Sequence, residues 1–164
     1  MTHIAIRDAK SEDFDRIVEL NEAEVRQTSP MSLQRLQTLA VMSYYHKVAV
    51  ADGRIVAFLL ALRDNAPYQN ENYAWFSERI QKFIYVDRIV VSSDYAGLKI
   101  GSLMYMDLFS FARLHSFNTI TCEYNIEPPN PVSQRFHDKF GFKELGTQWV
   151  ADGTKKVSLQ AAEV

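Results

Sequence analysis

The chain has 164 residues, of which 47% are hydrophobic and 23% charged, and its formal net charge is −2. This length suffices for one domain with a substantial core, and the small net charge argues against a nucleic-acid partner. No apolar run approaches the roughly 18 residues that span a bilayer, and no secretory leader is visible at the N-terminus. The single cysteine, Cys122, excludes an internal disulfide. We therefore expect a cytoplasmic protein without a membrane segment, folded as one domain over residues 1–164.

The spacing of apolar side chains predicts strands and helices in the order β-α-α-β-β-β-α-β-α-β-β. In chain order these are a strand at 2–7, a helix beginning at Ser11, a helix at 32–43, strands at 47–51, 54–63 and 83–91, a helix at 101–115, a strand at 119–125, a helix at 130–141, and strands at 142–150 and 154–161. Such an alternation predicts a mixed α/β sheet with helices on its faces.

The ends of several elements carry their own signals. Asp52-Gly53 and Asp152-Gly153 are typical of tight β-hairpins. Ser11 is a suitable cap for the first helix, and Asn130-Pro131 combines a capping side chain with a proline that fits the first helical position. Gly141 is a typical residue for ending the same helix.

The connection over residues 64–82 is long for a compact domain, and long connections are often lids or binding loops. It is rich in aromatic residues, among them Tyr68, Tyr73 and Trp75. We expect Tyr73 and Trp75 to contact a substrate. The alternative is that these rings only pack against a hydrophobic edge of the sheet.

The run from Asp87 to Ser102 reads as a β-branched strand, a short turn and a helix that opens at a glycine. Such a turn directs free backbone N–H groups at one point, with the positive end of a helix dipole behind them. Gly101 lets a ligand approach the backbone closely. The pattern favours a receptor for a phosphate or pyrophosphate, although an ordinary connection between a strand and a helix is the simpler alternative.

This run resembles the acyl-CoA-binding motif of the GCN5-related N-acetyltransferase (GNAT) superfamily. The matching positions are Val91, Tyr95, Gly97, Ile100 and Gly101, whereas Ala96 and Lys99 depart from the family pattern. The resemblance implies that the coenzyme A pyrophosphate binds the backbone at Leu98, Lys99, Ile100, Gly101 and Ser102. It also implies that the strand end at Val90 and Val91 pairs with the pantetheine arm.

A second segment, residues 125–142, resembles another motif of the same superfamily. The matching residues are Asn130, Ser133, Phe136, Lys139, Gly141 and Phe142. The resemblance implies that Asn130 and Ser133 contact the cofactor. The family's tyrosine, which protonates the departing thiolate, is replaced by His137, which could donate the proton as an imidazolium. A surface histidine without a catalytic part is the alternative.

An ammonium acceptor must lose a proton before it attacks, and two carboxylates lie on predicted strands beside the motif. Asp87 and Glu123 are therefore the candidate general bases. Each could instead form a structural pair with an arginine such as Arg63 or Arg88, or water could carry the proton away. Asn21 lies on the apolar stripe of the first helix, where it either contacts the acceptor or is satisfied by a neighbouring backbone group.

Together these features predict an α/β fold with a mixed, mostly antiparallel sheet and helices on both faces, as the GNAT resemblance implies. The expected activity is transfer of an acetyl group from acetyl-CoA to an amine, on a small molecule or a peptide, by direct attack. A module that binds acyl-CoA without turnover is the alternative, and a structural domain is a third. No spacing of metal ligands is present, so no metal is expected. A homodimer is plausible by family analogy.

Overall fold

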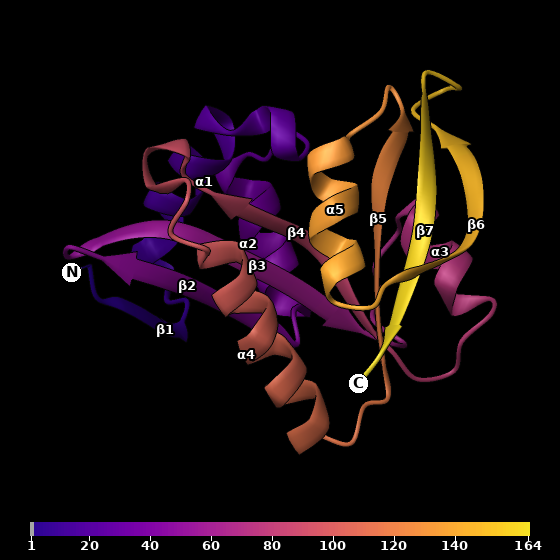
Figure 1. The fold of residues 1–164 in the computed structure, drawn as a ribbon, viewed down its shortest axis with the longest axis horizontal. Coiled ribbons are helices and arrows are strands. Elements are labelled where there is room, and N and C mark those ends of the chain that lie inside the picture. The colour runs from indigo at the N-terminus through magenta and orange to yellow at the C-terminus, as the bar shows by residue number, and fades with distance from the viewer. Residues whose placement is uncertain (1) are drawn as a thin grey trace. The chain divides into compact units, whose positions relative to one another are not determined.

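The computed structural model describes residues 2–164, with the side chain of Gln27 excepted. The elements are β1 (Ile4–Asp8), α1 (Phe14–Ala23), α2 (Leu33–Met42), β2 (Tyr45–Ala51), β3 (Arg54–Arg63), α3 (Glu71–Ser77), β4 (Ile84–Val91), α4 (Ile100–Leu114), β5 (Thr119–Glu127), α5 (Pro131–Lys139), β6 (Lys143–Val150) and β7 (Lys155–Glu163), with short 3-10 turns η1 (Ser11–Asp13), η2 (Val25–Gln27) and η3 (Ser93–Tyr95) (Figure 1). The strand order is β1-β2-β3-β4-β5-β7-β6. The predicted α/β class and mostly antiparallel sheet are confirmed.

The chain divides into two compact units. The first contains the residues up to Leu62 together with Val86–Leu108, and the second contains Arg63–Tyr85 and Phe109–Val164. Strand β4 and helix α4 each contribute to both units, and each unit is described below by itself.

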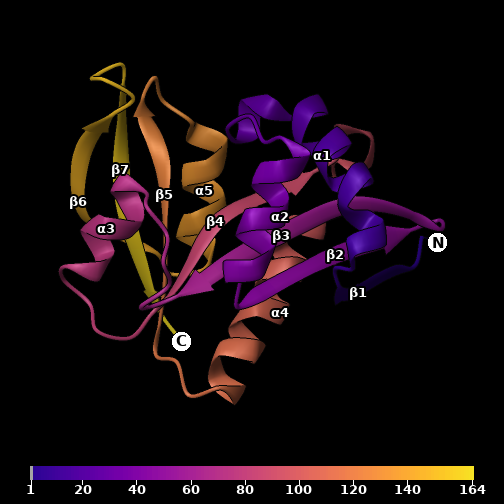
Figure 2. The same ribbon diagram turned by 180° about the vertical axis from the view of Figure 1, so that it is seen from behind.

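In the first unit, β1, β2 and β3 are antiparallel neighbours. Helices α1 and α2 cover one face of these strands, and the N-terminal part of α4 covers the other (Figures 1 and 2). The alternation of side chains along β2 matches this arrangement. The Tyr45 hydroxyl and Lys47 Nζ donate to Oδ2 of Asp107 on α4, at 2.7 and 2.8 Å. On the other face, the ring centroid of His46 lies 5.9 Å from that of Phe14 on α1.

In the second unit, β7 lies between β5 and β6 and is antiparallel to both. The start of β4 pairs in parallel with β5 through Ile84–Ile120 and Tyr85–Thr121. Helix α5 lies on one face of these strands and α3 on the other (Figures 1 and 2). The side chains of β5 therefore divide between an α5 face and an α3 face.

The connection over residues 64–82 is not the irregular loop that its length suggests, because it contains α3. Asn70 caps this helix, and its Oδ1 accepts hydrogen bonds from the backbone N–H groups of Asn72 and Tyr73, both at 3.0 Å. Tyr73 and Phe76 are 3% and 0% exposed. The aromatic residues of the segment thus supply much of the local core.

The predicted cap is confirmed for α5 but not for α1, and Ser32 caps α2 although no cap was predicted there. Ser32 accepts a hydrogen bond from Arg35 N at 3.1 Å, and Asn130 accepts one from Ser133 N at 3.2 Å. Ser11 opens the 3-10 turn η1 instead, and α1 begins only at Phe14.

His46, a half-buried histidine on β2, makes the fold sensitive to acid. The Nε2 atom of His46 is buried and has no hydrogen-bond partner among the described residues. Burial lowers the pKa of His46 from 6.5 to about 4, although the nearby Asp13 carboxylate, itself paired with Arg7, opposes the shift slightly. The folded state therefore resists protonation that the unfolded chain accepts.

We expect the free energy of unfolding to fall as the pH drops from about 6.5 to about 4, by up to about 3 kcal/mol from His46 alone. His46→Leu should remove most of this loss, and His3→Leu, at an exposed position, should leave it in place. Urea unfolding at several pH values measures the effect. An equal loss of stability in His46→Leu and the natural protein would contradict the assignment.

Candidate active site

The turn between β4 and α4 presents backbone N–H groups ahead of the helix. The first hydrogen bond of the α4 ladder that involves this turn runs from Leu103 N to Lys99 O, at 3.0 Å. The N–H groups of Ile100, Gly101 and Ser102 precede that bond, so they have no acceptor within the helix. They form the positive end of the α4 dipole, which favours an anion.

The backbone of this turn is left-handed at two places. Gly97 has a φ of +86° and Lys99 a φ of +58°. The second value explains why the related motif has glycine at this position, since a side chain with positive φ costs roughly 1 kcal/mol or more. Lys99 bears this cost and brings an ammonium group to the turn.

Two contacts inside the first unit hold the turn in place. The N–H of Ser92 donates to the carbonyl oxygen of Val56 on β3, at 2.8 Å. The carboxylate of Glu24, which follows α1, accepts hydrogen bonds from Ser93 N and Ser93 Oγ at 3.1 and 3.0 Å. Glu24 was not among the predicted site residues, because nothing in its sequence neighbourhood points to this contact.

Asp87 is buried in an ion pair. Its side chain is 4% exposed, and its Oδ2 lies 2.8 Å from Nε of Arg88, which is 6% exposed. Arg88 also donates to the carbonyl oxygen of Ser29 at 3.0 Å and to Oδ1 of Asn21 at 3.2 Å. Asn21 is fully buried, and its Nδ2 donates to the same Ser29 oxygen at 2.9 Å.

The structure therefore places Asn21 and Asp87 in one polar network with Arg88. Asn21 makes the backbone contact that was the alternative to a substrate role. The pairing of Asp87 with Arg88 matches the structural alternative that the sequence left open. These contacts attach the segment after α1 to β4.

On the second unit, the start of α5 holds the other predicted cofactor residues. The side chain of Asn130 caps the helix by accepting from Ser133 N. His137 lies one turn further along, 5% exposed, and its Nδ1 lies 2.7 Å from the carbonyl oxygen of Ser133. Its ring also packs 5.7 Å from that of Tyr124 on β5.

The protonation state of His137 follows from these contacts. Burial lowers the pKa of His137, more strongly than the Ser133 carbonyl and Asp138 raise it. A carbonyl oxygen only accepts, so the neutral ring carries its proton on Nδ1 and leaves Nε2 unprotonated. The imidazolium that an acid role requires is therefore disfavoured at neutral pH.

Glu123 lies in a different environment from Asp87. It is half-buried on β5, and the phenol of Tyr85 on β4 donates a hydrogen bond to its Oε1. Tyr85 was not predicted as a site residue. The signal that the sequence offers is a hydroxyl two positions before Asp87, and therefore on the same face of the predicted strand.

Known families and structures provide the deciding comparison. The sequence profile of the acetyltransferase (GNAT) family matches residues 5–142. The chain belongs to the GNAT family. No curated protein sequence matches it.

Solved structures support the same fold at low sequence identity. The ribosomal-protein-S18-alanine N-acetyltransferase from Escherichia coli superposes with a TM-score of 0.75 at 14% identity, covering 99% of this chain and 94% of its own. An N-acetyltransferase from Staphylococcus aureus Mu50 gives 0.73 at 20% identity, with 98% of each chain covered. A structure of the NatC complex bound to Gag peptide and CoA gives 0.76 at 13%, with 99% of each chain covered.

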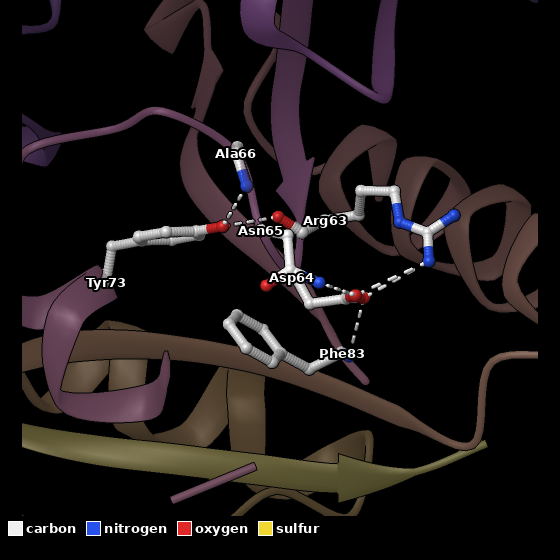
Figure 3. A network of polar contacts seen from close by, with 6 residues as sticks. All are labelled: Arg63, Asp64, Asn65, Ala66, Tyr73 and Phe83. Carbon is white, nitrogen blue, oxygen red and sulfur yellow. Dashed lines mark hydrogen bonds and ion pairs between the residues drawn. The ribbon is translucent and has the colours of Figure 1, made fainter. Parts of the chain in front are cut away.

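In this GNAT chain the two aromatic residues predicted to touch substrate have packing partners. The hydroxyl of Tyr73 donates to Arg63 O at 2.5 Å and accepts from Ala66 N at 2.9 Å (Figure 3). The Trp75 ring lies so close to Gly146 on β6 that an added Cβ would come within 2.6 Å of it. Both residues thus fit the alternative role of covering the sheet.

A cleft of about 340 Å³ in the first unit lies away from all predicted site residues. It is lined by Arg7, Asp13, Arg16, Glu19, Val50, Gly53, Arg54 and Ile55. Four of these form ion pairs with one another, Arg7 with Asp13 and Arg16 with Glu19. Among residues 2–164, no group of three or more potential metal ligands is found, and none of the helices is long and apolar enough to cross a membrane.

Proposed function

We propose that this GNAT protein transfers the acetyl group of acetyl-CoA to an amine by direct attack, without a covalent enzyme intermediate. The observation that carries the proposal is the turn from Gly97 to Ser102, where a left-handed backbone leads into an α4 whose first N–H groups are free of the helix ladder. It lies within the family match over residues 5–142.

The pyrophosphate of acetyl-CoA would bind the N–H groups at Leu98–Ser102, with the Lys99 ammonium adding charge. Gly101 presents no side chain to the phosphates. Strand β4 ends at Val91, shortly before this turn. We propose that the backbone at Val90 and Val91 pairs with the pantetheine arm, and that Asn130 and Ser133 are further cofactor contacts.

The acceptor in this proposal is a primary amine on a small molecule or a peptide. Its nitrogen attacks the thioester carbonyl carbon, the C–S bond breaks, and the proton of the amine leaves to a base. Glu123 suits that base better than Asp87. Asp87 is already neutralised by Arg88 in a buried pair, whereas Glu123 is half-buried.

Titration calorimetry with acetyl-CoA tests the cosubstrate site. We expect a micromolar Kd, equivalent to roughly −8 kcal/mol. Gly101→Glu should weaken binding at least about tenfold, because its carboxylate clashes with and repels the phosphates. Ser110→Glu adds the same charge at an exposed position of the same helix and should leave the affinity unchanged. No heat with the natural protein, or equal affinity in the folded Gly101→Glu variant, contradicts the assignment.

Release of free thiol from acetyl-CoA, followed with a panel of small amines and peptides, separates the enzyme from its alternative. Turnover with any amine supports the transferase. Tight binding without amine-dependent thiol release from the whole panel would favour a module that binds acyl-CoA without chemistry.

For His137 we propose a positioning role, in which its Nδ1–H holds the Ser133 carbonyl near the start of α5. An acid role would make kcat decline as the pH rises through the lowered pKa of this group. We expect kcat to show no such decline as the pH rises to 7. His137→Phe should weaken acetyl-CoA binding and reduce kcat less than about tenfold, below the usual range for a general acid.

His115→Phe is the matched control, since His115 makes the same kind of contact, Nδ1 to the carbonyl oxygen of Phe111 at 2.8 Å, at an exposed site. His115→Phe should change neither the affinity for acetyl-CoA nor kcat. A descending pH limb that disappears in His137→Phe, with a loss of about 100-fold or more, would restore the acid role.

A further inference from the structure

The hydrogen bond between Tyr85 and Glu123 joins a buried phenol to the proposed base. Tyr85 is 1% exposed, and its hydroxyl donates to Oε1 of Glu123 on the neighbouring strand. A phenol that donates to a carboxylate stabilises the ionised form and fixes the orientation of its oxygens. The second oxygen of Glu123 is then presented in a defined direction.

The ring of Tyr85 is held by other aromatic rings of the same unit. The ring centroids of Tyr73, Phe76 and Tyr68 lie 5.5, 6.0 and 6.5 Å from its own. A phenol enclosed in this way cannot swing aside without disrupting several ring contacts. Its hydroxyl is therefore a donor in a fixed position.

The surrounding cluster is itself attached to the backbone at several points, which Figure 3 shows. The Tyr73 hydroxyl bridges Arg63 O and Ala66 N, and the Asp64 carboxylate accepts from Phe83 N at 3.3 Å. These contacts connect the end of β3 with α3 and with the residue before β4. The aromatic segment thus forms a rigid support for Tyr85.

We propose that Tyr85 is a positioning residue that orients Glu123 and keeps it ionised, and that the segment 64–83 serves as its scaffold. This inference rests on the proposed function. As the new N–C bond forms, the amine proton passes to the carboxylate of Glu123, and the thiolate leaves. Glu123 then returns the proton to solvent, from which the thiolate is protonated.

Phenols and a thiol lie near this carboxylate. Tyr85 faces it from β4, and Tyr73 and Tyr68 lie behind that ring. On its own strand the neighbouring Cys122 is buried, and on β7 the paired residue is the apolar Leu159. Because the Tyr85 hydroxyl donates directly to this carboxylate, its removal should register in the titration of Glu123.

The test combines two readouts on Tyr85→Phe. Carbon-detected NMR follows the carboxyl titration of Glu123 without requiring activity, and the pH dependence of kcat/KM follows the base during turnover. We expect both titrations to move upward by about one pH unit or more, because the ionised carboxylate loses a donor. We expect kcat near neutral pH to fall about tenfold, with the KM for acetyl-CoA unchanged.

Tyr124→Phe is the control, since it removes a phenol hydroxyl from the residue next to Glu123 on the other face of β5, where its ring packs against His137, and it should leave both titrations in place. If Tyr85→Phe does not fold, Glu123→Asp withdraws the carboxylate from the phenol and should shift the kinetic limb in the same direction. Unchanged titrations in the folded variants overturn the positioning role, whatever the activity. A shifted NMR titration in a protein that releases no thiol with any amine overturns the proposed function, and the role of Tyr85 with it.

Discussion

A buried carboxylate must be paired with a cation, and on β4 the carboxylate of Asp87 is paired with the adjacent Arg88. The side chains of Asp87 and Arg88 are almost fully withdrawn from solvent and lie 2.8 Å apart. Removing either partner would leave an uncompensated charge in the interior, at a cost of several kcal/mol. Arg88 also donates hydrogen bonds to the carbonyl oxygen of Ser29 and to Oδ1 of Asn21. The ion pair thereby fixes the segment after α1 against the strand.

The same strand ends in the turn that we propose for the pyrophosphate. Ser92 is hydrogen-bonded to β3, and Glu24 binds Ser93, so the chain is held on both sides before it enters the left-handed positions. Preorganised N–H groups bind an anion without first having to be ordered. The segment after α1 is thus bound to β4 through Arg88 and Ser29, and to the turn through Glu24 and Ser93.

The elements with strong local signals were predictable from the sequence. The Asp-Gly hairpins, the Asn130-Pro131 helix start and the β-branched strand into residue 91 each depend on the conformational preferences of a few residues, and the structure has them. Helix α3 was missed because it has only seven residues inside an aromatic-rich connection, although Asn70 followed by Glu71 carries a capping signal.

Tertiary contacts decided the rest of the site. Local sequence cannot show that Asp87 is the buried partner of Arg88 while Glu123 is half-buried beside Tyr85, because both acids occupy similar strand positions. Nor can it show that Tyr73 turns its hydroxyl to the backbone of Arg63. The sequence could show only that Lys99 replaces a glycine of the related motif. That its φ is left-handed follows from the structure.

The central claim is that Glu123, and not Asp87, receives the acceptor's proton. The most direct measurement is the pH dependence of kcat/KM for Glu123→Gln and Asp87→Asn, corrected for the folded fraction of each variant. We predict that Glu123→Gln lowers kcat/KM about 100-fold or more and abolishes the acidic limb of its pH profile. Asp87→Asn should be less stable but should keep that limb. An acidic limb that survives in Glu123→Gln and vanishes in Asp87→Asn would contradict the account.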